Sequence, residues 1–177
     1  MDELVLIKPS KAYLDEIYEY RQEFLDNDER SAGDSGLRHF EDISAWLERC
    51  RLTESKETIP DPALVESEQF MLLYKGEKRI LGMINFRHYM NDYVAEYAGH
   101  IGYGVRPTER RKGYAKKMLG LCLEKCRLFS GLDKVLITCD DDNEASRRTI
   151  LAAKGVFERT NLTEDGQVGE RYWITLV

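Results

Sequence analysis

A short basic segment between a predicted strand and a predicted helix constrains this chain more than any other part of its sequence. Residues 98–105 have the composition of a strand, and apolar residues recur at helical spacing over 112–129. A helix that starts near residue 112 directs unpaired backbone N–H groups and the positive end of its dipole at the preceding loop. The loop, which therefore predicts an anion site, reads Arg106-Pro107-Thr108-Glu109-Arg110-Arg111-Lys112-Gly113-Tyr114-Ala115.

The composition of this loop favours a compact anionic ligand such as a pyrophosphate. Gly113 and Ala115 have little bulk to keep a phosphate from the backbone, and residues 110–112 add positive charge. The formal net charge of the chain is −6, which argues against nucleic acid as a partner. The basic cluster is therefore local, and consists of Arg106, Arg110, Arg111, Lys112, Lys116 and Lys117. The glycine patterns of Walker-type and dinucleotide-binding loops are both absent.

The remaining patterns predict an α/β (α+β mixed) chain. A strand at 4–7 precedes two helices, a hairpin and the strand, loop and helix described above, and two further strands and a helix complete the chain. The helices are expected at 14–25, about 39–52, 112–129 and 143–154, and the later strands at 70–74, 80–87, 98–105, 134–139, 156–159 and 171–177. This order, β-α-α-β-β-β-α-β-α-β-β, predicts a mixed, mostly antiparallel sheet flanked by helices on both faces. The strands at 98–105 and 134–139 are expected to be parallel, because a helix connects them.

No compositional break divides the chain, so residues 1–177 are expected to form a single domain. No uncharged apolar run approaches the length of a membrane span, and the N-terminus lacks a signal-peptide pattern, so a cytoplasmic location without membrane association is expected. Four scattered cysteines, Cys50, Cys122, Cys126 and Cys139, form no C-x-x-C pair. We expect free thiols and no metal.

A second motif, Asn143-x-x-Ser146, follows the strand at 134–139 and opens the last helix. Asparagine is a common helix N-cap, so a purely structural role is one interpretation. An amide and a hydroxyl at the carboxyl end of a strand are also well placed to contact a ligand that lies across the sheet. Both interpretations stay open for these two residues.

Together these motifs resemble the core of GNAT acetyltransferases. The resemblance is carried by His100-Ile101-Gly102-Tyr103-Gly104-Val105 and the basic loop, by Asn143-Glu144-Ala145-Ser146, and by Gly155-Val156-Phe157. Two short motifs are similar to ones shared by a bacterial subgroup of predicted acetyltransferases, Arg87-His88 and Tyr172-Trp173-Ile174. The resemblance implies a GNAT-like fold and an acetyl-CoA-dependent N-acetyltransferase that uses acetyl-CoA as its cosubstrate.

The resemblance also implies residues for the cofactor. The strand at 98–105 would diverge from the strand at 134–140, and backbone groups of 103–105 would pair with the pantetheine arm in the gap. The amides of 111–115 would hold the pyrophosphate, and Asn143 and Ser146 would contact the pantetheine or its phosphate end. The cofactor-binding residues expected in this way are Val105, Arg110, Arg111, Lys112, Gly113, Tyr114, Ala115, Asn143 and Ser146.

The catalytic residues are less well defined. A protonated amine must lose its proton before it attacks a thioester, and Glu96 and His100 are the candidate bases. The proton for the departing thiolate comes, in many members of the family, from a tyrosine at the position that Ile150 occupies here. Tyr103, Tyr114 and Cys139 are candidates by proximity, and water is an alternative. An acyl-enzyme on Cys139 is a further option.

The acceptor is expected to be a small-molecule or peptide amine. It should enter from the side of the first two helices, segment 85–97 and the last hairpin, which contribute Tyr18, Trp46, Arg87, His88, Tyr93, Tyr172 and Trp173. The acidic chain as a whole favours a cationic acceptor. Two functions remain open: a working acetyltransferase, and a catalytically silent acyl-CoA-binding or sensing module, which the isoleucine at position 150 favours. The oligomeric state is open as well, with a homodimer as one option.

Overall fold

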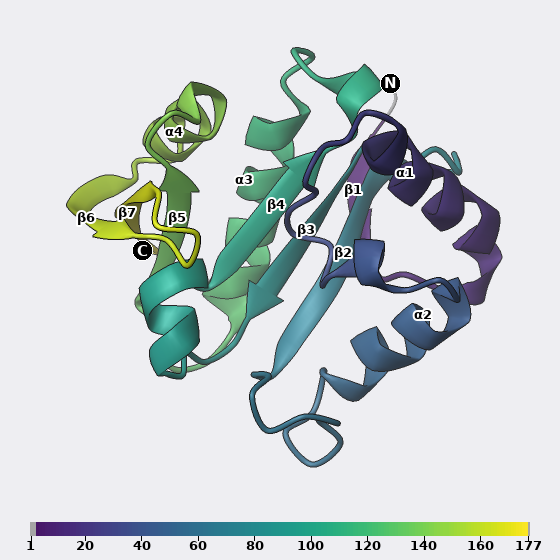
Figure 1. Ribbon diagram of the computed structural model, residues 1–177, viewed down its shortest axis with the longest axis horizontal. Helices are drawn as coiled ribbons and strands as arrows, with labels where there is room; N and C mark the ends of the chain where they lie inside the picture. The colour runs from purple at the N-terminus through teal and green to yellow at the C-terminus, as the bar shows by residue number, and fades with distance from the viewer. Residues whose placement is uncertain (1–2, 177) are drawn as a thin grey trace.

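The computed structural model describes residues 3–176 and divides its strands between two sheets (Figure 1). The larger sheet has the order β1-β2-β3-β4, and the smaller sheet has the order β5-β7-β6. The strands are β1 (Leu4–Ile7), β2 (Ser67–Tyr74), β3 (Gly82–Arg87), β4 (Ile101–Val105), β5 (Lys134–Asp140), β6 (Val156–Leu162) and β7 (Val168–Thr175). The α-helices are α1 (Leu14–Asp26), α2 (Ile43–Leu52), α3 (Tyr114–Leu128) and α4 (Glu144–Ala152). Short turns of 3-10 helix are η1 (Lys11–Tyr13), η2 (Leu37–His39) and η4 (Pro107–Glu109), and η3 (Val94–Ala98) is a π-helix.

These elements confirm the predicted fold class and element order. Neighbouring strands within each sheet are antiparallel, as the registers Phe70↔Ile84 and Leu136↔Trp173 show. The last predicted strand included Val177, which lies outside the described residues. Within residues 3–176, no helix has both the length and the apolar character that crossing a membrane requires.

The strands β4 and β5 do not form the expected parallel pair. They run in the same general direction but diverge along their length (Figure 1), and they belong to different sheets. A single bridge, Gly99↔Ile137, joins the two sheets at this point, and its local pattern is antiparallel. The N–H of Leu136 donates to Nδ1 of His100 at 2.9 Å rather than to a backbone carbonyl, so a side chain interrupts the ladder as it begins.

The larger sheet is covered on both faces, and its alternating side chains divide between two cores. On one face, Leu72, Ile84 and Phe86 pack against α3, whose Met118 and Cys122 are fully buried. On the other face, Met71 and Met83 of the sheet belong to one core with buried side chains of α1 and α2, which are Ile17, Tyr20, Phe24 and Trp46. Each large apolar side chain buried in this way contributes about 1.5–3 kcal/mol. The prediction that Cys122 and Cys126 serve packing is confirmed, since all four cysteines are buried free thiols.

The glycines of β4 allow a loop to lie directly on this strand. A Cβ atom added at Gly104 would lie 2.7 Å from the carbonyl oxygen of Ala32, and one added at Gly33 would lie 2.4 Å from that of Gly102. Real Cβ atoms do not approach backbone atoms so closely, so both contacts require glycine. Residues 30–36 are thereby held over the face of β4 that does not face α3.

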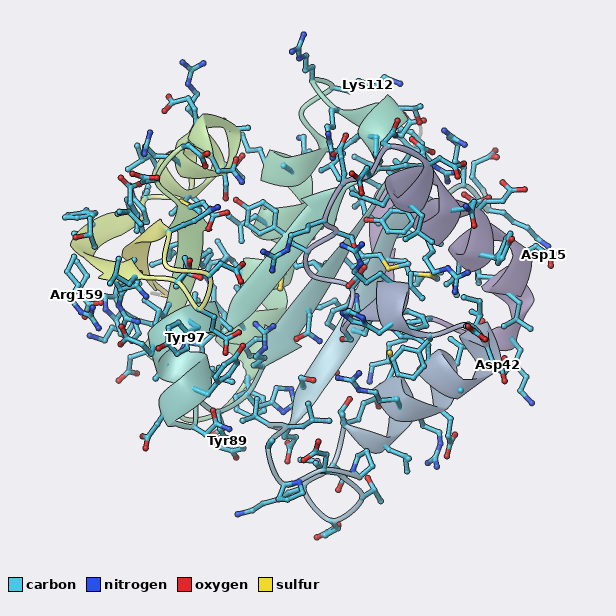
Figure 2. All side chains as sticks on the ribbon, viewed as in Figure 1. Asp15, Asp42, Tyr89, Tyr97, Lys112 and Arg159 are labelled. Carbon is cyan, nitrogen blue, oxygen red and sulfur yellow. The ribbon has the colours of Figure 1, made fainter. Side chains whose placement is uncertain are left out.

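The π-helix η3 was not predicted, and it shortens the strand expected at 98–105. Gly99 ends the helix with φ of 67° and ψ of −172°, a conformation that other residues rarely adopt. The buried guanidinium of Arg171 donates to the carbonyl oxygens of Ala95 and Glu96, which satisfies part of the helix end. Figure 2 labels Tyr97 on this helix and Arg159 on the neighbouring strand β6.

Candidate functional site

The start of α3 provides a backbone anion site. Gly113 is the N-cap, with φ of 82°, and no side chain caps the helix. Arg111 also has positive φ, at 65°, so the loop turns its backbone sharply before the helix begins. A Cβ atom added at Gly113 would meet nothing within 4 Å, which leaves open space directly over the first helical N–H groups. The N-terminus of α3 is therefore accessible to a ligand with phosphate groups.

A cleft of about 690 Å³, which we call the loop cleft, opens over this helix start. It lies between α3, β4, the beginning of α4 and residues 29–32 of the preceding loop. Most of the residues expected to bind the cofactor line it: Val105, Arg110, Arg111, Gly113, Tyr114, Ala115, Asn143 and Ser146. Lys112 does not line it, and Figure 2 shows this residue at the outer end of the loop.

Carboxylates offset part of the positive charge of the loop. Arg110 pairs with Glu29, and Lys112 pairs with Glu109 at 2.8 Å. Arg106 does not belong to the anion site, contrary to the sequence analysis. It is 3% exposed, and its guanidinium pairs with Glu16 and Glu23 on α1. Its role is to hold the end of β4 against α1.

Asn143 and Ser146 have the structural role that the sequence left open, and both also line the loop cleft, so contact with a ligand stays a prediction. Oδ1 of Asn143 accepts from the N–H of Ser146 at 3.0 Å, which is a helix N-cap. The hydroxyls of Ser146 and Tyr103 are 2.8 Å apart and hydrogen-bonded. Burial raises the pKa of Tyr103 to about 12. Its phenol is therefore protonated at neutral pH and can donate a hydrogen bond.

A second cleft of about 870 Å³, the wide cleft, adjoins the loop cleft. Residues that line both are Arg30, Ala32, Tyr103, Asn143 and Ser146. The wide cleft continues between residues 30–39 and η3, and reaches Thr138 and Cys139 on β5. Of the residues expected on the acceptor side, Arg87 and Tyr93 line it. Trp46 and Tyr172 are buried in the cores, and His88 is held between Glu66 and Glu68.

His100 lies beneath the site rather than in it. The side chain is 4% exposed and lines neither cleft. Nδ1 already accepts the N–H of Leu136, so the lone pair that a base would need is occupied. Burial lowers the pKa of His100 to about 4, and the charge of Arg87 adds to this effect. The geometry argues for a structural histidine.

We expect the substitution His100→Asn to change stability rather than catalysis. Asparagine can keep an acceptor near the position of Nδ1, but it does not titrate. Because the folded pKa of His100 is below the unfolded value of 6.5, unfolding takes up a proton as the pH falls through this window. The free energy of unfolding should therefore decrease between about pH 6.5 and pH 4 more steeply in wild type than in His100→Asn. Urea denaturation at a series of pH values measures this difference, and equal slopes would contradict it.

Glu96 and Cys139, two further candidates, are also poorly suited to the chemistry. Glu96 pairs with Arg159 at 2.7 Å on the outside of η3, and this hydrogen bond lowers its pKa. It lines neither cleft. Burial raises the pKa of Cys139 to about 11, so its thiol is protonated and a poor nucleophile. Ile150, at the position where a tyrosine is expected, is fully buried in the core.

Sequence reasoning missed the loop at 30–36, which forms a wall of the wide cleft. The signal was present in Ser31-Ala-Gly-Asp-Ser-Gly36, a run of small and polar residues between two helices. It also missed Tyr97, which lies beside Tyr93 with ring centroids 5.3 Å apart. Among residues 3–176, no group of three or more His, Cys, Asp and Glu side chains is arranged to hold a metal ion.

Comparisons with known proteins agree with this fold. The family model described as "Acetyltransferase (GNAT) family" matches residues 14–152. A search among curated proteins finds no significant match. Solved structures match over nearly the whole chain. The microcin C7 self-immunity acetyltransferase MccE, in complex with acetyl-CoA and AMP, has 18% identity and a TM-score of 0.73, with 99% of this chain and 93% of that one covered.

Two further structures are similar in the same way. One is a Vibrio cholerae protein with the provisional description of ribosomal-protein-serine acetyltransferase. It has 17% identity and a TM-score of 0.68, with 99% of this chain and 95% of that one covered. RimJ from Mycobacterium smegmatis, in complex with CoA-disulfide, has 16% identity and a TM-score of 0.70, with coverage of 97% and 81%. At these identities the likeness establishes the fold.

Proposed function

The chain belongs to the GNAT acetyltransferase family and transfers an acetyl group from acetyl-CoA to an amine, and we propose that its two clefts divide the substrates between them. The loop cleft binds acetyl-CoA, and the wide cleft binds the amine acceptor. The observation that carries this assignment is that Tyr103, Asn143 and Ser146 line both clefts. Groups bound in the two clefts would meet at these residues.

The loop cleft fits the diphosphate of CoA. The uncapped N-terminus of α3 offers N–H donors, and Gly113 leaves the space above them open. We propose that Arg110, Arg111, Gly113, Tyr114 and Ala115 hold the diphosphate. The divergence of β4 from β5 leaves the edge of β4 unpaired beyond Gly99↔Ile137, which supports pairing of the pantetheine arm with residues 103–105. Lys112 contributes long-range charge at most.

Tyr103 is the residue we propose to assist the chemistry. Acetyl-CoA supplies an acyl thioester, and its sulfur leaves as a thiolate unless a proton or a hydrogen bond reaches it. Ile150 cannot supply either, whereas the phenol of Tyr103 faces both clefts and keeps its proton at neutral pH. Ser146 orients this phenol at 2.8 Å. The amine loses its proton to water in the wide cleft, because His100 and Glu96 lie outside it.

Turnover of acetyl-CoA with a panel of amines tests this function. Release of free thiol that depends on both the amine and the protein, with the acetylated amine identified by mass spectrometry, is the expected result. A catalytically silent binding module would bind acetyl-CoA, and its melting temperature would rise, but it would release no thiol with any amine. The family assignment does not favour that alternative.

Three properties of the whole chain belong to the same proposal. Residues 1–177 form one domain, which is supported by structural matches that cover 97–99% of the chain. The cytoplasm is the proposed location, supported by four buried free thiols. Nucleic acid is not a proposed partner, in keeping with the net charge of −6.

We further propose a homodimer formed through β6. This strand is the edge of the smaller sheet, and Val156, Phe157 and Leu162 on it are 67%, 51% and 64% exposed. An edge strand with exposed apolar side chains is a surface on which a second strand can pair. Light scattering of wild type and of the variant Phe157→Lys measures the state, and a monomeric wild type would contradict the dimer.

A further inference from the structure

The charged side chains that line the wide cleft include more arginines than carboxylates, whereas the chain as a whole has a negative net charge. Three arginines, two aspartates and one histidine line it: Arg30, Arg38, Arg87, Asp34, Asp140 and His39. The carboxylate of Asp34 is 4% exposed and accepts hydrogen bonds from Ser31 and from the N–H groups of Gly36 and Leu37. The acidic composition of the surface therefore does not describe the region where the acceptor binds.

Arg87 is an unusual arginine in this protein. Two other partly buried or buried arginines pair with two carboxylates each: Arg106 with Glu16 and Glu23, and Arg147 with Glu144 and Glu170. Within residues 3–176, no carboxylate pairs with Arg87. Among the described residues, its guanidinium makes one hydrogen bond, from Nη1 to the carbonyl oxygen of Gly99, at 3.1 Å.

The surroundings of Arg87 leave its charge without compensation. Burial lowers its pKa to about 10, so the guanidinium is charged at neutral pH but poorly solvated. The same charge helps to depress the pKa of the neighbouring His100. A guanidinium has five N–H donors in a planar fork that matches a carboxylate or a phosphate. An anion that enters the cleft would supply the partner that residues 3–176 do not.

Arg87 lies on the side of the cleft that leads to Tyr103. A Cβ atom built at Gly102 would be 3.7 Å from Nη1 of Arg87, and Gly102 directly precedes Tyr103 in β4. Tyr93 and Tyr97 form the adjoining wall from η3. If the amine of an acceptor lies at Tyr103, a group at the other end of the same molecule can therefore reach the guanidinium of Arg87.

We propose that the acceptor carries an anionic group, a carboxylate or a phosphate, which Arg87 binds while the amine faces Tyr103. This inference rests on the proposed function, and it makes Arg87 a residue that determines specificity. It also replaces the cationic acceptor expected from net charge. Tyr93 and Tyr97 contact the part of the acceptor between the two groups.

Matched pairs of amines test the proposal. One series consists of ω-amino carboxylates of increasing chain length and their carboxamides, and another compares aminoethyl phosphate with ethanolamine. We expect kcat/KM to favour the anionic member of a pair roughly 10- to 100-fold, in line with a hydrogen bond between charged groups. The first series reports on a carboxylate and the second on a phosphate. Wild type that prefers the neutral or a polycationic amine would overturn the proposal.

The variant Arg87→Gln assigns the preference to this side chain. Its KM for the anionic acceptors should rise roughly 10- to 100-fold, the size of the wild-type preference, and kcat/KM for the carboxamides should change little. Arg127→Gln is a matched control, because Arg127 also donates to a single carbonyl, that of Leu176, and lies outside both clefts. An anion preference that survives in Arg87→Gln would overturn the assignment.

Failure of the acceptor proposal can be separated from failure of the function. Turnover of neutral amines without an anion preference contradicts only the role of Arg87. If no amine of either series gives thiol release, and acetyl-CoA does not bind either, the proposed function itself is contradicted. If acetyl-CoA binds and no amine turns over, the anionic amines are titrated into the CoA complex in a calorimeter, and their binding decides whether the acceptor proposal holds. Binding that Arg87→Gln abolishes supports the proposal, and no binding to wild type overturns it.

Discussion

Gly113→Glu is expected to abolish acetyl-CoA binding and leave the protein folded. The added side chain places bulk and negative charge in the open space over the first N–H groups of α3, where we place the diphosphate. In wild type, a hundredfold excess of acetyl-CoA over Kd should stabilise the fold by about 2.7 kcal/mol, which raises Tm by roughly 5–10 °C. The variant should show no rise at the same concentration, as a thermal shift assay can measure.

The chain offers a close control for this substitution. Gly131 follows the other end of α3, has φ of 93°, and would also meet nothing within 4 Å if it carried a Cβ atom. Glutamate at either position has the same backbone cost of about 1–2 kcal/mol for left-handed φ. Gly131→Glu should therefore lose similar stability but keep the acetyl-CoA shift. A folded Gly113→Glu protein that still binds acetyl-CoA would contradict the site.

The sequence was sufficient to predict the loop cleft because its determinants are local. A strand, a basic loop with Gly113 and a helix lie in direct succession, and Asn143 opens the next helix after β5. The backbone donors come with the start of any helix, so they depend little on distant contacts. Arg106 and Lys112 departed from the expectation, since neither lines the loop cleft and both pair with carboxylates, those of Glu16, Glu23 and Glu109.

The candidate bases could not be judged from sequence, because their environments are set by distant residues. His100 accepts a hydrogen bond from Leu136, 36 positions along the chain. Glu96 pairs with Arg159, 63 positions away. Neither contact has a local signal. A histidine beside a strand has the same appearance in sequence whether its lone pair is free or occupied, and only the tertiary contact separates a base from a structural residue.

The wide cleft was only partly predictable for a similar reason. Segment 85–97 was expected to face the acceptor, and Arg87 and Tyr93 do line the cleft. The opposite wall depends on the close contact of residues 32 and 33 with β4, which Gly33, Gly102 and Gly104 permit. Glycines in a strand predict a close approach, but they do not indicate which segment approaches.

Tyr103→Phe is expected to reduce kcat roughly 10²- to 10³-fold and to change the KM for acetyl-CoA little. The substitution removes only the phenolic hydroxyl, which faces both clefts and which we propose as the hydrogen-bond donor to the departing sulfur. Losing one such donor typically has an effect of this size on kcat, because the interaction forms mainly in the transition state. Steady-state kinetics with the best acceptor of the panel measures the change.

Two further variants separate this role from the hydrogen bond that orients it. Tyr74→Phe also removes a phenol bonded to a hydroxyl, that of Tyr114 at 3.2 Å, but Tyr74 lines neither cleft and kcat should be unchanged. Ser146→Ala keeps the phenol of Tyr103 and removes its partner, so its effect should stay within roughly tenfold, the equivalent of one neutral hydrogen bond.

Because burial holds the pKa of Tyr103 near 12, the wild-type rate should not fall between pH 7 and about pH 10. If Tyr103→Phe retains near-normal kcat, the proposed role of Tyr103 is wrong, and water or Tyr114, which also lines the loop cleft, protonates the thiolate instead.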